Sequence, residues 1–70
     1  MTLADEIRVA ERHVRVGQRH IRRQRTIISD LEAKGLPAGE AIHFLDLLEQ
    51  NQRAHLDERD RLRRLSQSVN

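Results

Sequence analysis

Three of the four glycine and proline residues in this chain lie within one five-residue segment, Gly35 to Gly39. Inside a helix, glycine is about 1 kcal/mol and proline about 3 kcal/mol less favourable than alanine. The segment therefore predicts a turn at residues 35–38 between two long helices. We expect the first helix at about residues 3–34 and the second at about 38–65, with residues 66–70 fraying as a tail.

The first helix has recognisable signals at both ends. Thr2 and Asp5 have the spacing of a capping box at its start. At its end, Gly35 can take the left-handed position that closes a helix, which makes Leu36 and Leu31 the apolar pair of a Schellman ending. No comparable capping side chain precedes the second helix.

Both helices carry a seam of residues spaced alternately four and three apart. In the first helix the seam positions are Leu3, Ile7, Ala10, Val14, Gly17, Ile21, Gln24, Ile28 and Leu31. In the second helix they are Ala41, Leu45, Leu48, Gln52, His55, Arg59, Leu62, Ser66 and Val69. A strict heptad spacing of this kind is typical of coiled-coil packing. Because the turn is short, we predict a single all-α domain, an antiparallel two-helix coiled-coil hairpin.

The predicted turn also sets which residues face each other across the seam. Their numbers should add up to about 73, which places Gly17 opposite His55 and Leu56. We interpret this mid-helix glycine as making room for that bulky pair.

A second line of residues flanks the seam and includes five apolar side chains. This apolar stripe consists of Val9, Val16, Ile27, Phe44 and Leu47. A hairpin has only one internal seam, so a second apolar face needs another partner. We expect that partner to be a second copy of the chain, which would give a homodimeric four-helix bundle. The alternative is that these are scattered surface residues of no consequence.

A third line, the arginine stripe, points away from the seam in the first helix and consists of Arg8, Arg12, Arg15, Arg19 and Arg22. All but one of the 13 basic residues are arginine, and the sequence pI is about 10.4 although the net charge is only +2. The stripe would allow contact with the phosphate backbone of RNA or DNA. We favour an ordinary solvated face, because four acids of the second helix should weaken its field. These acids are Glu49, Asp57, Glu58 and Asp60.

Five acid–base pairs at i,i+4 spacing are expected to support the helices. They are Glu11/Arg15, Asp30/Lys34, Glu49/Arg53, Asp57/Arg61 and Asp60/Arg64.

The residue types present do not suggest catalysis. The chain has no Cys, Tyr or Trp, and its serines are outside any nucleophile motif. His20 and His55 could approach each other across the hairpin, but two histidines do not complete a zinc site. We therefore predict no enzyme activity, no catalytic residue, no cofactor and no metal site. The lack of cysteine and of a membrane-length apolar run indicates a soluble cytoplasmic protein with no membrane association.

The run AERHVRVGQRHIRRQRTIISDLEAKGL and the later run LLEQNQRAHLDERDRL resemble small helical-hairpin proteins of GC-rich alphaproteobacteria. The resemblance spans about residues 9–62. It implies a hairpin fold with a Leu-rich second helix, and it implies no activity. We therefore expect a protein-interaction or regulatory module that acts through its helix surfaces, with nucleic-acid binding through the arginine stripe as the alternative.

Overall fold

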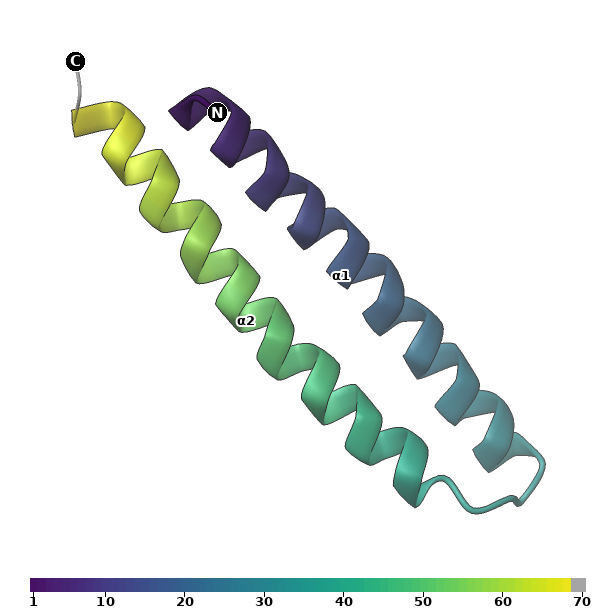
Figure 1. Cartoon of the computed structure of the whole chain (residues 1–70). Coiled ribbons are helices and arrows are strands. Elements are labelled where there is room, and N and C mark those ends of the chain that lie inside the picture. Colours follow the sequence, from purple (N-terminus) through teal and green to yellow (C-terminus); the bar gives the residue numbers. More distant parts are fainter. Residues whose placement is uncertain (69–70) are drawn as a thin grey trace.

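A computed structural model describes residues 1–68, and within that range it contains two α-helices and no strand (Figure 1). Helix α1 spans Leu3–Ala33 and α2 spans Gly39–Ser68. The chain reverses at the loop between them, so the start of α1 and the end of α2 lie at the same end of the molecule. The Cα trace measures 56 × 16 × 14 Å. These observations confirm the prediction of an all-helical hairpin.

The two ends of α1 follow the signals in the sequence. The backbone N–H of Asp5 donates to the Thr2 hydroxyl, and the Thr2 backbone N–H donates to the Asp5 carboxylate, which completes the capping box. At the other end Gly35 has φ 67°, a left-handed conformation that a side chain would strain. The backbone N–H of Leu36 donates to the Leu31 carbonyl and that of Gly35 to the Glu32 carbonyl. This is the predicted Schellman ending.

The helix α2 begins without a side-chain cap and ends later than expected. Its first backbone hydrogen bond runs from the Ile42 N–H to the Ala38 carbonyl. It continues to Ser68, three residues beyond the expected end near Leu65, because no glycine or proline interrupts it there. Residues 69 and 70, which include the expected seam position Val69 and the end of the expected tail, lie outside the described residues.

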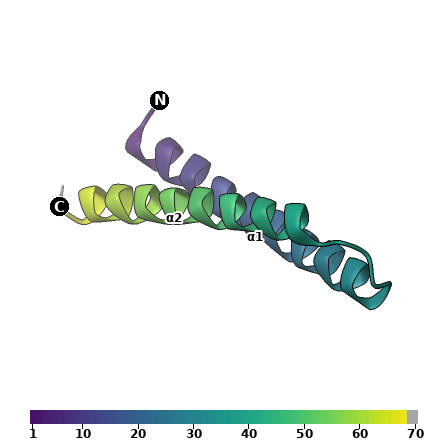
Figure 2. The ribbon, with the colours of Figure 1, turned by 90° about the horizontal axis from the view of Figure 1, so that it is seen from below.

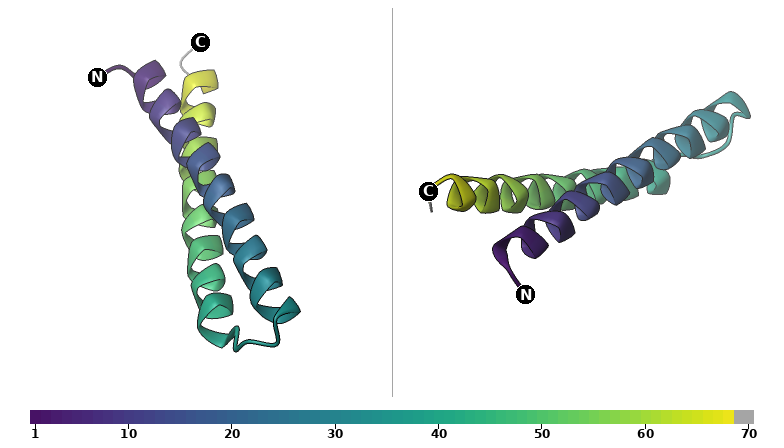
Figure 3. Two further views of the ribbon diagram at one scale, coloured as in Figure 1. Left: turned by 90° about the vertical axis from the view of Figure 1, so that its right-hand side faces the viewer. Right: turned by 90° about the horizontal axis from the view of Figure 1, so that it is seen from above.

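The seam positions predicted from the sequence form the contact between the helices. None of them up to Ser66 is exposed, and the buried ones are Ala10, Val14, Gln24, Ile28, Gln52 and Leu62. Seen from below, the two helices cross at an angle, so that the start of α1 stands clear of α2 (Figure 2). The right-hand view of Figure 3 shows the same divergence at the start of α1.

Two buried glutamines, one on each helix, each donate a hydrogen bond to the backbone of the other helix. Gln24 of α1 donates its amide N–H to the Ala41 carbonyl of α2 at 3.0 Å. Gln52 of α2 donates to the Val14 carbonyl of α1 at 2.9 Å. Each side chain is at most 8% exposed. Because each bond joins a side chain to a fixed backbone atom on the other helix, together they hold the helices at one register.

The prediction that Gly17 faces His55 and Leu56 is wrong. A Cβ atom built on Gly17 would collide with the side-chain amide of Gln52. The register is shifted by about one helical turn from the expected one, because the loop folds back along α1 before α2 begins. The end of α1 extends past the start of α2 (Figure 2).

Exchange of Gly17 for alanine should therefore have opposite effects in two backgrounds. In the wild-type chain, Gly17→Ala should lower the free energy of unfolding by about 1 kcal/mol, because displacing Gln52 outweighs the gain in helix propensity. In a Gln52→Ala chain the space beside Gly17 is free, and Gly17→Ala should raise the free energy of unfolding by about 1 kcal/mol. Urea unfolding of the four proteins measures the coupling. An equal effect of Gly17→Ala in both backgrounds would contradict the contact.

Candidate interaction surfaces

The apolar stripe predicted from the sequence lies on one face of the hairpin and remains largely open to solvent. Val9 and Leu47 are each 43% exposed, Ile27 39% and Phe44 50%, whereas Val16 is half-buried. Leu65, also 43% exposed, continues the same four-and-three spacing from Leu47 along α2. The sequence reasoning missed Leu65 because the polar residues Glu58 and Arg61 occupy the intervening steps.

A groove follows this face between the two helices. Its central hollow, of about 460 Å³, lies against Val9, Gly17, Leu48 and Gln52. A second hollow of about 330 Å³ lies nearer the loop against Ile27 and Phe44, and shares His20 and Leu48 with the first. A third, of about 180 Å³, shares Val9 and His13 with the central one and reaches the start of α1. The shared residues make the three hollows one continuous groove.

The histidines contribute to the groove, but in a different pairing from the expected one. His55 lies against His13, with ring centroids 5.1 Å apart and ring planes tilted by 49°. The shift in register explains why His13 takes the place expected for His20. Within residues 1–68, no three His, Cys, Asp or Glu side chains are grouped so that they could hold a metal ion.

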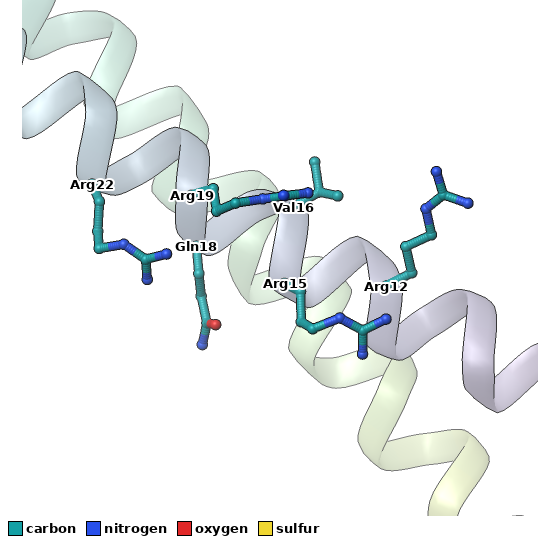
Figure 4. A pocket seen from close by; sticks show the side chains of 6 residues that line it. All are labelled: Arg12, Arg15, Val16, Gln18, Arg19 and Arg22. Atoms are coloured by element: carbon teal, nitrogen blue, oxygen red, sulfur yellow. The ribbon is translucent and has the colours of Figure 1, made fainter.

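The arginine stripe lies on the side of α1 that faces away from α2, and all five of its side chains are exposed. Arg8 pairs with Asp5. The other four line a shallow depression of about 570 Å³ together with Val16 and Gln18. Figure 4 shows these side chains leaving α1 on successive turns, with α2 behind.

Of the four acids of α2 that were expected to weaken the field of this stripe, three pair with arginines outside it, and Asp57 takes part in no ion pair within residues 1–68. Glu49 lies 3.4 Å from Arg25, Glu58 2.6 Å from Arg61 and Asp60 3.0 Å from Arg59. None of the five expected i,i+4 pairs is among the ion pairs of the described residues. The acids instead meet arginines one or three positions away, or on the other helix, since several arginines lie within reach of each carboxylate.

Hydrogen bonds from these partners shift the pKa values of three carboxylates. Bonds from the Thr2 backbone and hydroxyl hold the pKa of Asp5 below its ordinary value. The bond from Arg61 lowers the pKa of Glu58 and in turn raises that of Arg61. The bond from Arg63, at 2.6 Å, lowers the pKa of Glu11, with smaller contributions from the charges of Arg15 and Arg59. The Glu11–Arg63 pair joins the two helices near the end of the hairpin opposite the loop.

Comparison with known proteins found no matching family model, and no curated protein or solved structure that matches this chain significantly. The apolar stripe and the arginine stripe therefore rest on the residues and geometry described above. Neither helix of residues 1–68 contains a segment long and apolar enough to cross a membrane.

The Glu11–Arg63 pair should make stability depend on pH. Since folding lowers the pKa of Glu11, the pair stabilises the fold fully above the unfolded-state pKa of about 4.3, and that contribution disappears as pH falls through the folded-state value. Thermal unfolding should show a lower Tm for Glu11→Gln than for wild type at pH 7, with the gap closing below about pH 4.

Asp46, which is exposed and takes part in no ion pair within the described residues, offers the control for this measurement. Asp46→Asn should leave the Tm close to the wild-type value at pH 7. A gap between wild type and Glu11→Gln that stays constant down to pH 3 would mean that the substitution acts through packing and not through charge.

Proposed function

We propose that this chain is a cytoplasmic, non-enzymatic protein-interaction module, an antiparallel coiled-coil hairpin that pairs with a second copy of itself to form a four-helix bundle. The observation that carries the proposal is the exposed apolar stripe along a continuous groove between the helices. As a bundle, the protein would act in a regulatory or scaffolding role through its outer helix surfaces.

The small size of the hairpin's own core supports this proposal. In residues 1–68 the buried apolar side chains are Ala10, Val14, Ile28 and Leu62, and no side chain is less than 2% exposed. A chain of this size without disulfides usually relies on a metal or on oligomerisation to complete its core. Oligomerisation through the apolar stripe would bury the larger side chains that the hairpin leaves in water.

The shape of the surface favours a second copy as the occupant. The groove and the apolar side chains lie on the same face, so one copy offers both the hollow and the residues that fill it, as a two-fold symmetric interface requires. Ile27 and Phe44 flank the hollow near the loop, and Val9 and Leu65 extend the stripe to the other end.

The dimensions of this face suit an interface of ordinary size. One long face of the hairpin measures 56 Å by 16 Å, about 900 Å². Each partner in a stable complex typically buries about 800 Å². Contact along most of the length of the hairpin is therefore needed, which is the arrangement of helices in a four-helix bundle.

The mass of the protein in solution tests this proposal directly. Size-exclusion chromatography with light scattering at tens of micromolar should give twice the chain mass of 8.2 kDa. A well-folded monomer at that concentration would overturn the dimer and would make the apolar stripe a docking surface for a different protein.

Substitutions on the apolar stripe should dissociate the dimer into monomers. Phe44→Glu with Leu47→Glu places two charges in the proposed interface, and desolvating them would oppose association. We expect a monomer with reduced helicity by circular dichroism, because the hairpin would lose the surface that completes its core.

Arg53→Glu provides a control with the same change in net charge. Arg53 is exposed and lies nine residues, or two and a half turns, from Phe44, which places it on the opposite side of α2. This variant should remain a dimer. Dissociation of both variants would show that net charge, and not the apolar stripe, controls association.

A further inference from the structure

Four neighbouring arginines on α1 have no ion-pair partner within the described residues. Arg12, Arg15, Arg19 and Arg22 are exposed and take part in none of the ion pairs of residues 1–68. The sequence contains no acid between Glu11 and Asp30. Glu49, Glu58 and Asp60, three of the four α2 carboxylates expected to neutralise this surface, pair with arginines outside it, so no ion pair within the described residues neutralises its charge.

We propose that these four arginines bind the phosphodiester backbone of a double-stranded nucleic acid, an activity that goes beyond the proposed self-association. Arginine presents a planar fork of N–H donors that matches the oxygens of a phosphate. The row from Arg12 to Arg22 is about 15 Å long at 1.5 Å per residue. A duplex carries one phosphate charge for about every 1.7 Å of its axis, so a row of this length meets several phosphates at once.

The composition of the surface selects a duplex backbone over a single strand. Binding of single strands relies on aromatic side chains that stack on bases. The depression around the arginines holds only Val16 and Gln18 besides the arginines themselves, and the only aromatic residue of the Phe, Trp and Tyr types in the chain is Phe44, on α2. The amide of Gln18 adds a further donor for a phosphate or sugar oxygen.

The same composition disfavours a lipid surface. A helix that lies on a membrane inserts an apolar face between the headgroups and holds basic residues beside it. The apolar seam of α1 is buried against α2 instead, at Ala10, Val14 and Ile28. The apolar stripe beside the arginines is exposed on a single chain, but the second copy covers it in the proposed dimer, so no apolar face remains next to the arginines to enter a membrane.

The arginines also remain accessible in the proposed dimer. Arg8, Arg12, Arg15, Arg19 and Arg22 each come one residue before a position on the line that contains Val9 and Val16. One residue corresponds to a rotation of about 100° around the helix. Arg12 also lines the central hollow of the groove, but a second copy seated on the apolar stripe would leave Arg15, Arg19 and Arg22 facing solvent.

Fluorescence anisotropy with labelled 16-base-pair RNA and DNA duplexes tests this proposal. Four phosphate contacts per chain predict a slope of about −3.6 for log Kobs against log salt, which is a loss of about 150-fold in affinity between 50 and 200 mM salt. Binding to both duplexes would indicate recognition of the shared backbone, and binding to one would identify which duplex the surface fits. No binding to either duplex at 50 mM salt would overturn the proposal.

Matched variants assign the contact to these residues. Arg15→Gln with Arg19→Gln removes two contacts and should reduce the loss over the same salt range to about 12-fold. Arg61→Gln with Arg64→Gln removes the same charge from the end of α2 and should leave the salt slope unchanged. Glutamine keeps the helix propensity of arginine, and circular dichroism verifies that all variants are folded.

Two results would contradict the assignment. Equal reductions in slope for the two double variants would show attraction by net charge without a defined site. Tighter binding to vesicles containing 30% phosphatidylserine than to either duplex at 100 mM salt, lost in Arg15→Gln with Arg19→Gln, would show that the arginines recognise a lipid surface instead.

Discussion

Two hydrogen bonds, from the Gln24 amide to the Ala41 carbonyl and from the Gln52 amide to the Val14 carbonyl, fix the register of the two helices. Apolar contacts alone would tolerate a slip of the seam, because leucine, isoleucine and valine pack acceptably at several registers. An amide directed at one carbonyl of the facing helix allows only one register without leaving a buried donor unpaired, which costs about 1–3 kcal/mol. The glycine at position 17 depends on this arrangement, since the Gln52 amide occupies the space of its missing side chain. The Oε1 atom of Gln52 is buried without a hydrogen-bond partner in the described structure, so stability is given up for a defined register.

The polar residues in the seam also explain why apolar side chains are left exposed on the outer surfaces. The middle of α2 contributes Gln52, His55 and Arg59 to the contact between the helices, so the hairpin gains little apolar burial there. Several large apolar side chains, Phe44 and Leu47 among them, lie outside the seam and are exposed. Three acids of α2, Glu49, Glu58 and Asp60, pair with arginines outside the arginine stripe. The two surfaces thus differ in chemistry, and each is continuous along the helices.

The helices, the capping box, the Schellman ending and the seam could be predicted from the sequence because each depends on residues close together in the chain. The spacing of Thr2 and Asp5, and of Leu31, Gly35 and Leu36, determines local backbone hydrogen bonds. The register across the seam depends on how the loop turns back in space, and residue numbers do not encode this. The partners of Gly17 and His55 were wrong for that reason.

The ion pairs were also difficult to predict. A carboxylate such as Glu58 has arginines at positions 59, 61, 63 and 64 within its neighbourhood, and small differences in side-chain conformation decide between them. The exposure of the apolar stripe could be predicted from helical periodicity, because it required only that a hairpin has a single internal face. Its extension to Leu65 could not be predicted, since charged residues interrupt the apolar pattern on α2.

The outer ends of α1 and α2 lie at the same end of the molecule (Figure 1). A hairpin of this kind can be inserted into a surface loop of a larger protein, since its two attachment points leave in the same direction and the host chain continues past it. Its 56 Å length would then project from the host as a rigid arm, with the Gly35 turn at the tip. The position of the two helix ends thus makes the hairpin geometrically compatible with insertion into another chain.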